Sequence, residues 1–215
     1  MSCCDQDVYD DRFDARSAEL ELREYQRHGP DDWTTRLIDE LAAGGVDGLT
    51  VLDIGAGVGA VHHALLAAGA RSAVDVDASG PYLDVARGEA ERRGLVDRVT
   101  YRKGDAVAIA PDLDDADLVA LDRVVCCYGD MPGLVGAAAA RTRRRLAMVL
   151  PRDDIWIRAM VAMANGWDRI RRDPFRILAH RTADVIRVAT AAGLVQRSAH
   201  RGMFWQSLVF ERVRG

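Results

Sequence analysis

The spacing of hydrophobic positions changes partway along the chain. In its first part, apolar residues recur every three or four positions within 15–28 and 32–43, which is the period of an amphipathic helix. A Gly-Pro pair at 29–30 and a Gly-Gly pair at 44–45 follow these segments, and both pairs disfavour a continued helix. The pattern therefore predicts a helical lead over residues 1–48.

After this lead, short apolar runs rich in β-branched residues alternate with helical patterns. The apolar runs lie at 49–55, 72–78, 98–105, 117–125 and 145–151. The helical patterns lie at 58–70, 81–94 and 133–145. Strands that alternate with helices in this way form a parallel sheet with helices on both faces.

The last part of the chain breaks this alternation. Two helical patterns, 155–172 with an interruption near Gly166 and then 182–193, precede two apolar runs that are separated by only a few residues. Strands joined by so short a connection pair antiparallel. The sequence thus predicts one α/β domain over residues 49–215. Its Rossmann-like, seven-stranded sheet is mostly parallel and ends in an antiparallel C-terminal hairpin, with helices on both faces.

Composition and charge narrow the functional class. The 215 residues suffice for one large domain, and 29 basic against 33 acidic residues give a net charge of −4, so nothing demands a nucleic-acid partner. No apolar run approaches the roughly 20 residues that span a bilayer. The acidic N-terminus lacks the apolar core of a signal peptide. We therefore expect a cytoplasmic protein with reduced cysteines and with neither a nucleic-acid nor a membrane partner.

The four cysteines occur as two adjacent pairs, Cys3-Cys4 and Cys126-Cys127. Structural zinc sites usually separate neighbouring ligands by two to four residues, so the pairs do not predict a metal site. The second pair follows the apolar run at 117–125. Alternation would turn one thiol inward and the other away. We expect Cys126-Cys127 to be small side chains in a pocket wall.

The stretch "GAGVG" separates the first apolar run of the domain from a helical pattern. Gly55 permits a tight turn, Gly57 lets the backbone approach a ligand, and Gly59 allows the helix to pack close to the strand. Together with Ala60, the stretch also satisfies the dinucleotide fingerprint G-x-G-x-x-A. The loop alone therefore fits NAD(P) as well as other nucleoside cofactors.

Three acidic residues at the ends of successive strands help to distinguish NAD(P) from other nucleoside cofactors. Asp53 precedes the glycine loop, where it would repel a pyrophosphate but suit a ligand that carries an amine. Asp77, 22 residues after Gly55, can accept hydrogen bonds from ribose hydroxyls. Asp105, followed by a free backbone N–H, can recognise the amino group and a ring nitrogen of adenine. Acids in this register suit a nucleoside without phosphates.

In this order the motifs resemble those of the class I S-adenosylmethionine (SAM)-dependent methyltransferases. "VLDIGAGVG" is similar to the first motif of that family, "VDVDAS" to the second and "RKGDA" to the third, and the resemblance covers roughly residues 49–213. Within the family, the chain looks loosely like small-molecule O-methyltransferases of the magnesium-protoporphyrin type. The resemblance implies SAM as cofactor and a small-molecule acceptor, with oxygen as the favoured acceptor atom.

The resemblance also implies which residues hold the cofactor. They are Asp53, Gly55, Ala56, Gly57 and Gly59 around the loop, and Asp77, Ala78, Asp105 and Ala106 at the next strand ends. Asp75 shares a strand face with Asp77, since successive side chains alternate, and is the second choice for the ribose. The adjacent His62 and His63 are interpreted as packing or solvent residues.

The segment after the fourth strand is expected beside the transferred methyl group, because ligands of open α/β sheets lie beyond the carboxyl ends of the strands. Methyl transfer requires an acceptor held in line. It requires a base only where the acceptor must lose a proton. The candidates for a catalytic or orienting group are Asp122, Tyr128 and His180, with Asp130 as a further one.

Three other functions fit parts of the pattern. An NAD(P)-dependent oxidoreductase fits the glycine loop, although Asp53 and the lack of a second catalytic domain argue against it. A non-catalytic partner subunit could retain the fold with or without SAM. Aminopropyl transfer uses the same fold, but the chain shows no dense acidic groove for a polyamine. In the methyltransferase interpretation, the helical lead could close the site, with Tyr25 and Arg36 reaching over the cofactor.

Overall fold

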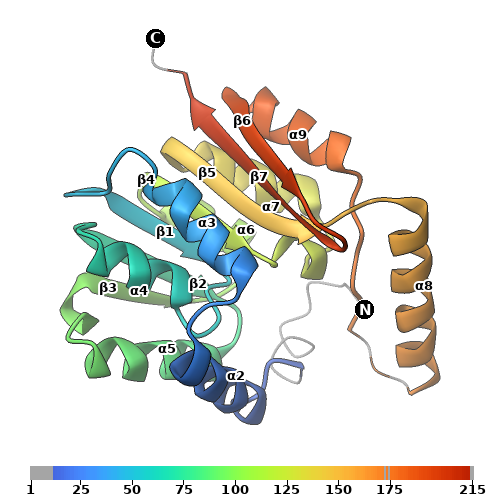
Figure 1. The fold of residues 1–215 in the computed structure, drawn as a ribbon, viewed down its shortest axis with the longest axis horizontal. Coiled ribbons are helices and arrows are strands. Elements are labelled where there is room, and N and C mark those ends of the chain that lie inside the picture. The colour runs from blue at the N-terminus through green and yellow to red at the C-terminus, as the bar shows by residue number, and fades with distance from the viewer. Residues whose placement is uncertain (1–11, 172, 174, 214–215) are drawn as a thin grey trace.

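Seven strands form one sheet in the computed structural model, which describes residues 12–171, 173 and 175–213. Their order across the sheet is β3-β2-β1-β4-β5-β7-β6 (Figure 1). The first five strands run parallel, and β7 runs antiparallel to both β5 and β6. The strands are β1 (Thr50–Ile54), β2 (Ser72–Asp77), β3 (Val99–Lys103), β4 (Ala116–Asp122), β5 (Thr142–Pro151), β6 (Leu194–Arg201) and β7 (Trp205–Arg212). The predicted mostly parallel sheet with an antiparallel hairpin is confirmed.

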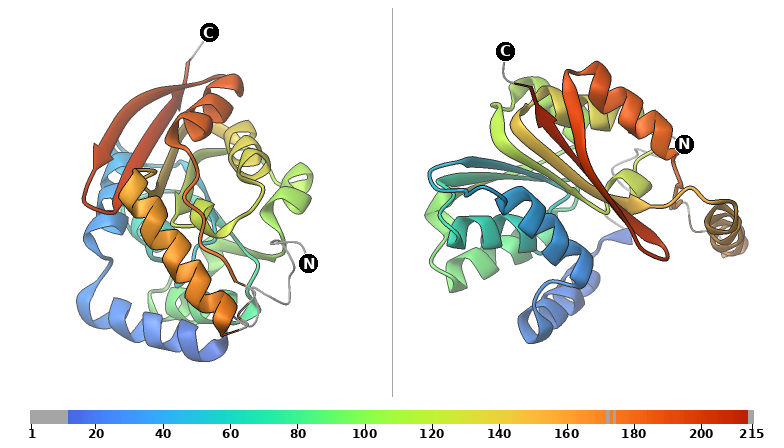
Figure 2. Two further views of the ribbon diagram at one scale, coloured as in Figure 1. Left: turned by 90° about the vertical axis from the view of Figure 1, so that its right-hand side faces the viewer. Right: turned by 45° about the horizontal axis from the view of Figure 1, so that its top comes forward.

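Helices cover both faces of the sheet (Figures 1 and 2). One face packs against α3 (Asp32–Ala42), α4 (Ala60–Ala67) and α5 (Gly80–Arg92), and α2 (Ala15–His28) lies outside α5. The other face packs against α6 (Ala106–Ile109), α7 (Met131–Ala140) and α9 (Thr182–Ala191). Helix α8 (Ile155–Ile170) stands at the edge of the molecule. Short 3-10 turns occupy η1 (Val96–Arg98), η2 (Ala110–Asp112) and η3 (Val125–Cys127).

Burial on both faces explains why the parallel strands read as continuous apolar runs. In β4, Val119 and Leu121 belong to the core beneath α7, whereas Leu118 and Ala120 belong to the core beneath α3 and α4. Successive side chains thus enter opposite cores. Within the described residues, no helix is both long enough and apolar enough to cross a bilayer.

Side-chain caps fix where several helices begin. Asp31 accepts hydrogen bonds from the N–H groups of Trp33 and Thr34 at the start of α3. Ser79 and Asp130 accept from the first turns of α5 and α7 in the same manner. These bonds satisfy N–H groups that lack a partner within the helix. The Ser79 cap starts α5 directly after β2, which ends at Asp77.

The structure differs from the sequence prediction around the arginine cluster. The predicted helix 133–145 ends at Ala140, and Arg143–Arg145 instead lie in β5. The reason is tertiary: Arg145 forms an ion pair of 2.8 Å with Glu211 on β7 and donates to the Glu40 carbonyl in α3. Such contacts override helix propensity. The predicted interruption of α8 near Gly166 is also wrong, because α8 continues to Ile170.

Candidate active site

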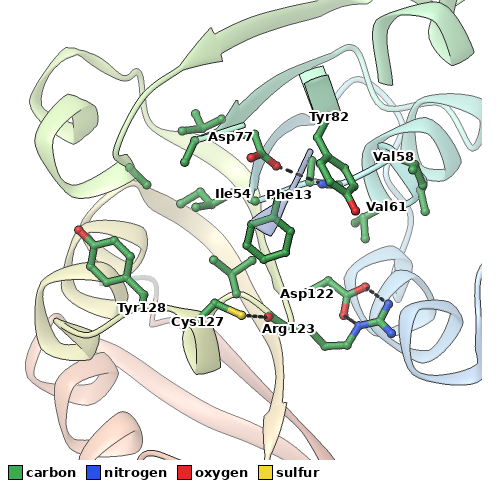
Figure 3. A pocket seen from close by; sticks show the side chains of 18 of the residues that line it. Phe13, Ile54, Val58, Val61, Asp77, Tyr82, Asp122, Arg123, Cys127 and Tyr128 are labelled. Atoms are coloured by element: carbon green, nitrogen blue, oxygen red, sulfur yellow. Dashed lines mark hydrogen bonds and ion pairs between the residues drawn. The ribbon is translucent and has the colours of Figure 1, made fainter. Parts of the chain in front are cut away.

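A cavity of about 450 Å³ opens where the glycine loop meets the carboxyl ends of β1, β2 and β4 (Figure 3). Seven of the nine residues predicted to hold the cofactor line it: Gly55, Ala56, Gly57, Asp77, Ala78, Asp105 and Ala106. The other two, Asp53 before the loop and Gly59 at its end, are buried and do not line the cavity. The described part of the helical lead contributes Phe13, Glu21, Asp31 and Thr34 to the wall. Tyr25 and Arg36 are not among the lining residues.

Two glycines of the loop have no room for a side chain. Gly55 has φ +64°, and a Cβ atom there would lie 2.5 Å from Cγ2 of Val124. Gly59 has φ +82°, and its Cβ would lie 2.5 Å from the His63 ring and 2.8 Å from the His62 ring. Both positions thus combine a left-handed backbone with a close neighbour. At Gly59 the close neighbours are two imidazole rings, which the sequence pattern did not indicate.

A buried polar cluster lies directly beneath the loop. Asp53, His62, His63 and Asp75 are each 0 % exposed. Asp53 Oδ2 accepts from the backbone N–H of His62 (3.2 Å) and lies 2.9 Å from His62 Nδ1. Asp53 therefore holds the first turn of α4. His62 and His63 are packing residues, and burial lowers the pKa of His63 to about 3, so its ring is neutral.

Asp75 and His63 are the two members of this cluster whose side-chain polar atoms all lack a hydrogen-bond partner among the described residues. Asp75 lies beside Asp53 in the neighbouring strand. Burial, reinforced by the charge of Asp53, raises the pKa of Asp75 well above its usual range. Because Asp75 does not line the cavity, it is poorly placed to be the alternative ribose ligand.

Asp77 joins the end of β2 to the glycine loop. Its Oδ2 accepts from Gly57 N–H (3.3 Å), and its Oδ1 accepts from Ser79 N–H (2.8 Å). Burial nevertheless raises the pKa of Asp77 to about 6, because two backbone donors offset only part of the desolvation. Hydrogen bonds from further hydroxyl groups would stabilise the ionised form of this desolvated carboxylate. Figure 3 shows Asp77 pointing into the cavity.

Two residues predicted for different roles meet on another wall of the cavity. The Tyr128 hydroxyl lies 2.7 and 2.8 Å from the two carboxylate oxygens of Asp105. Asp105 also caps α6, because its Oδ1 accepts from Val107 N–H at 2.8 Å. Tyr128 therefore fixes the orientation of Asp105.

A network between β4 and α3 forms a further wall. Asp122 Oδ2 accepts from the Thr34 hydroxyl at 2.5 Å, and Arg123 Nε lies 3.2 Å from Asp122 Oδ1. Arg123 also reaches Asp31 at 2.6 Å, and it is the one non-glycine residue with positive φ (59°) in the described chain. Burial raises the pKa of Asp122, although the Arg123 charge opposes this. Neither Thr34 nor Arg123 was predicted as a site residue.

The adjacent cysteines lie in the 3-10 turn η3, because β4 ends at Asp122. Strand alternation therefore does not apply: their Sγ atoms are 3.7 Å apart, Cys127 lines the cavity and Cys126 is buried behind it. His180 does not line the cavity, and its Nε2 lies 3.0 Å from the Tyr128 carbonyl oxygen. Asp130 is exposed and caps α7. Cys3-Cys4 lie outside the described residues.

Residues 51–147 match the family model of a methyltransferase domain. The matched part, 97 of the 215 residues, is a methyltransferase domain. The match confirms the predicted enzyme class, whose methyl donor is SAM. None of the curated proteins compared with this methyltransferase matches it significantly.

Solved structures share most or nearly all of this fold. Magnesium protoporphyrin IX methyltransferase from Synechocystis PCC 6803, crystallised with bound SAH, is 18% identical with a TM-score of 0.75, over 97% of this chain and 99% of that one. An O-methyltransferase family protein from Burkholderia thailandensis is 19% identical with a TM-score of 0.72 (96% and 63% covered). Geranyl diphosphate C-methyltransferase from Streptomyces coelicolor A3(2) is 14% identical with a TM-score of 0.66 (84% and 76%). These neighbours methylate different atoms, so they do not identify the acceptor.

Proposed function

We propose that this methyltransferase transfers a methyl group from SAM to a hydroxyl group of a small molecule. The observation that supports the proposal is a cavity whose wall carries Asp77 and Asp105, which we propose bind the nucleoside, and on another side the partly buried Asp122 (Asp77 and Asp122 are labelled in Figure 3). Two of the neighbours named above are described as methyltransferases of a porphyrin and of the O-methyltransferase family, which supports oxygen as the acceptor atom.

The lining residues fit the cofactor. The left-handed backbone at Gly55 and Gly57 opens the loop toward the cavity, where the methionine part would lie. Asp77 would accept hydrogen bonds from the ribose hydroxyls, relieving the desolvation that raises its pKa. Asp105 and the N–H of Ala106 would read adenine beside Ala56 and Ala78.

Two predicted cofactor residues act without lining the cavity in this proposal. Asp53 would position the loop through the His62 N–H, and Gly59 would make room for the two imidazole rings. When bound, SAM supplies a methyl group on an electron-poor sulfonium sulfur. The chain then has to hold an acceptor in line with that group and exclude water.

Asp122 is the proposed base among the three catalytic candidates. It lines the cavity, and its raised pKa favours accepting a proton from an acceptor hydroxyl. Thr34 and Arg123 would orient its carboxylate. Tyr128 and His180 are proposed as positioning residues, because Tyr128 binds Asp105 and His180 binds the Tyr128 carbonyl.

The helical lead is proposed to complete the site. We assign residues 49–215 to the catalytic domain and 1–48 to a lead that closes the cavity from one side. Phe13 and Glu21 already line that side, and the Glu21 carboxylate accepts from the Tyr82 hydroxyl at 2.8 Å. A cavity closed in this way would admit a small molecule.

Calorimetric binding of S-adenosylhomocysteine (SAH) and of NADH tests the cofactor assignment, with Asp77→Ala as the matched variant. We expect SAH to bind, NADH not to bind, and the variant to lose most of the SAH affinity. Transfer of radiolabelled methyl to a panel of phenols, carboxylic acids and carbon nucleophiles then tests the acceptor. Labelling of carbon nucleophiles but not of phenols would overturn the hydroxyl assignment.

A further inference from the structure

The adjacent thiols of Cys126 and Cys127 have no chemical role in the function proposed above. Their Sγ atoms are 3.7 Å apart, and both lie near the Arg123 carbonyl oxygen, at 3.1 and 3.6 Å. Figure 3 shows Cys127 between Tyr128 and Arg123 along the wall of the cavity. An S–S bond is about 2.05 Å long, so the two sulfur atoms would form one after moving about 1.7 Å toward each other.

The two thiols differ in their access to solvent. Cys127 lines the cavity and is partly exposed, whereas Cys126 is 4% exposed and lies behind it. The hydrogen bond between them lowers the pKa of Cys127 and raises the pKa of Cys126, which burial raises further. Because the thiolate is the reactive form of cysteine, an oxidant that enters the cavity meets the more readily ionised sulfur first. Cys127 is thus placed as the attacking thiol and Cys126 as its resolving partner.

The backbone at the pair is a turn and not a sheet strand. Both cysteines lie in the 3-10 turn η3, beyond the end of β4, and Arg123, just before this turn, has a left-handed φ of 59°. Adjacent Cα atoms are about 3.8 Å apart, less than the roughly 4.4 Å or more of most disulfides. A bond between these neighbours would be strained and therefore easily reduced, which suits a reversible site better than a structural crosslink.

The residues on either side of the pair hold two acids of the cavity wall. Tyr128 follows Cys127 directly, and its hydroxyl lies 2.7 and 2.8 Å from the carboxylate oxygens of Asp105. Arg123 lies on the other side, with its Nε 3.2 Å from Asp122. Closing an S–S bond turns the peptide between the two cysteines and displaces the Tyr128 backbone with it. We therefore expect Asp105, the acid proposed to recognise adenine, to lose its fixed orientation.

We propose that Cys126 and Cys127 form a reversible oxidation site, at which hydrogen peroxide joins the two thiols in a disulfide and thereby weakens cofactor binding. The Cys127 thiolate attacks one peroxide oxygen and the O–O bond breaks. The released hydroxide takes up a proton to become water, and a sulfenic acid remains. The Cys126 thiol then gives up its proton and attacks the Cys127 sulfur, the S–O bond breaks, and a second water leaves. The two thiols lose two electrons and two protons, which the peroxide gains.

Peptide mass spectrometry of the full chain tests whether this bond forms. Trypsin, which cuts after arginine and lysine, leaves both thiols in one peptide, 124–141. After brief exposure to hydrogen peroxide, this peptide should be lighter by two hydrogen atoms, about 2 Da, and dithiothreitol should restore both thiols. In Cys126→Ser, Cys127 should instead gain oxygen in steps of about 16 Da, and dithiothreitol should not reverse the later steps. Fragment ions distinguish oxygen on Cys127 from oxygen on Met131.

Cys3→Ser/Cys4→Ser is the matched control, because it removes the other adjacent pair of cysteines in the sequence. This variant should form the bond between Cys126 and Cys127 as the wild type does. A wild-type peptide that gains oxygen without losing hydrogen would overturn the proposal. So would a disulfide from Cys127 to Cys3 or Cys4.

Calorimetric titration with SAH tests the effect of the bond on the cavity. The dissociation constant should rise at least about fivefold on oxidation, because a hydrogen bond to the Asp105 carboxylate is lost, and should return after treatment with dithiothreitol. Circular dichroism establishes that the oxidised protein is folded. Equal affinity of the oxidised and reduced wild type would overturn the link to cofactor binding. If the reduced protein did not bind SAH, the function proposed above would fail, whereas the mass change would still decide whether the thiols join.

Discussion

The raised pKa of Asp77 predicts that cofactor affinity depends on pH. The side chain must be ionised to accept two hydrogen bonds from ribose hydroxyls, yet its pKa in the free protein is about 6. Relative to the usual Asp value, this shift corresponds to about 3 kcal/mol in favour of the protonated form. Bound hydroxyls stabilise the carboxylate, so binding below pH 6 requires loss of this proton.

The expected size of the effect follows from the titration. With a pKa of about 6, roughly 90% of the free protein carries ionised Asp77 at pH 7 and roughly 10% at pH 5. The dissociation constant for SAH should therefore rise about tenfold between pH 7 and pH 5, which is about 1.4 kcal/mol of binding free energy. Near pH 6 each binding event should release about half a proton.

Isothermal titration calorimetry measures both quantities, the second from the dependence of the heat on the buffer. Asp77→Asn is the matched variant: it keeps the size of the side chain, cannot titrate, and should bind SAH more weakly with no slope over this range. A wild-type affinity that is flat between pH 5 and pH 7 would refute the reasoning. So would an Asp77→Asn variant that retains the slope, because the titrating group would then be another one.

Three further predictions concern stability and turnover. The raised pKa of Asp75 makes the folded protein bind a proton that the unfolded chain releases above about pH 4. Asp75→Asn should therefore raise the melting temperature, and the gain should be larger at pH 8 than at pH 5. An equal gain at both pH values would contradict this. Gly59→Ala should lower the free energy of unfolding by at least about 2 kcal/mol in urea, whereas Gly88→Ala, in an open helical position, should raise it slightly. Asp122→Asn should lower kcat by about 10²-fold or more with little change in SAH affinity, and a variant with unchanged kcat would remove Asp122 as the base.

Much of the fold was predictable because its signals are local. The β-branched runs, the helix caps and the turn at Gly55 each act within a few residues of sequence. The parallel strands are buried on both faces, so each appears in the sequence as a continuous apolar run. The arginine cluster was misassigned because its conformation is decided by Glu211 and by the end of α3, which lie far away in the sequence.

The site was predictable only in part for the same reason. Asp77 and Asp105 could be placed at one edge because strand ends converge there. The hydrogen bond from Thr34 to Asp122 joins residues 88 positions apart, and no local sequence pattern indicates it. Nor could the sequence show that Asp53 faces α4 and not the cavity, since this depends on how His62 packs beneath the loop.

The position of β7 between β5 and β6 has a consequence for synthesis on the ribosome. Strand β6 precedes β7 in the chain but pairs only with β7. While residues 152–204 are being made, the edge of β5 lacks its neighbour, and β6 emerges before it has anywhere to pair. An open edge of this kind is where nascent chains associate wrongly. Binding by a chaperone during translation should therefore concentrate on this interval and end once β7 closes the sheet.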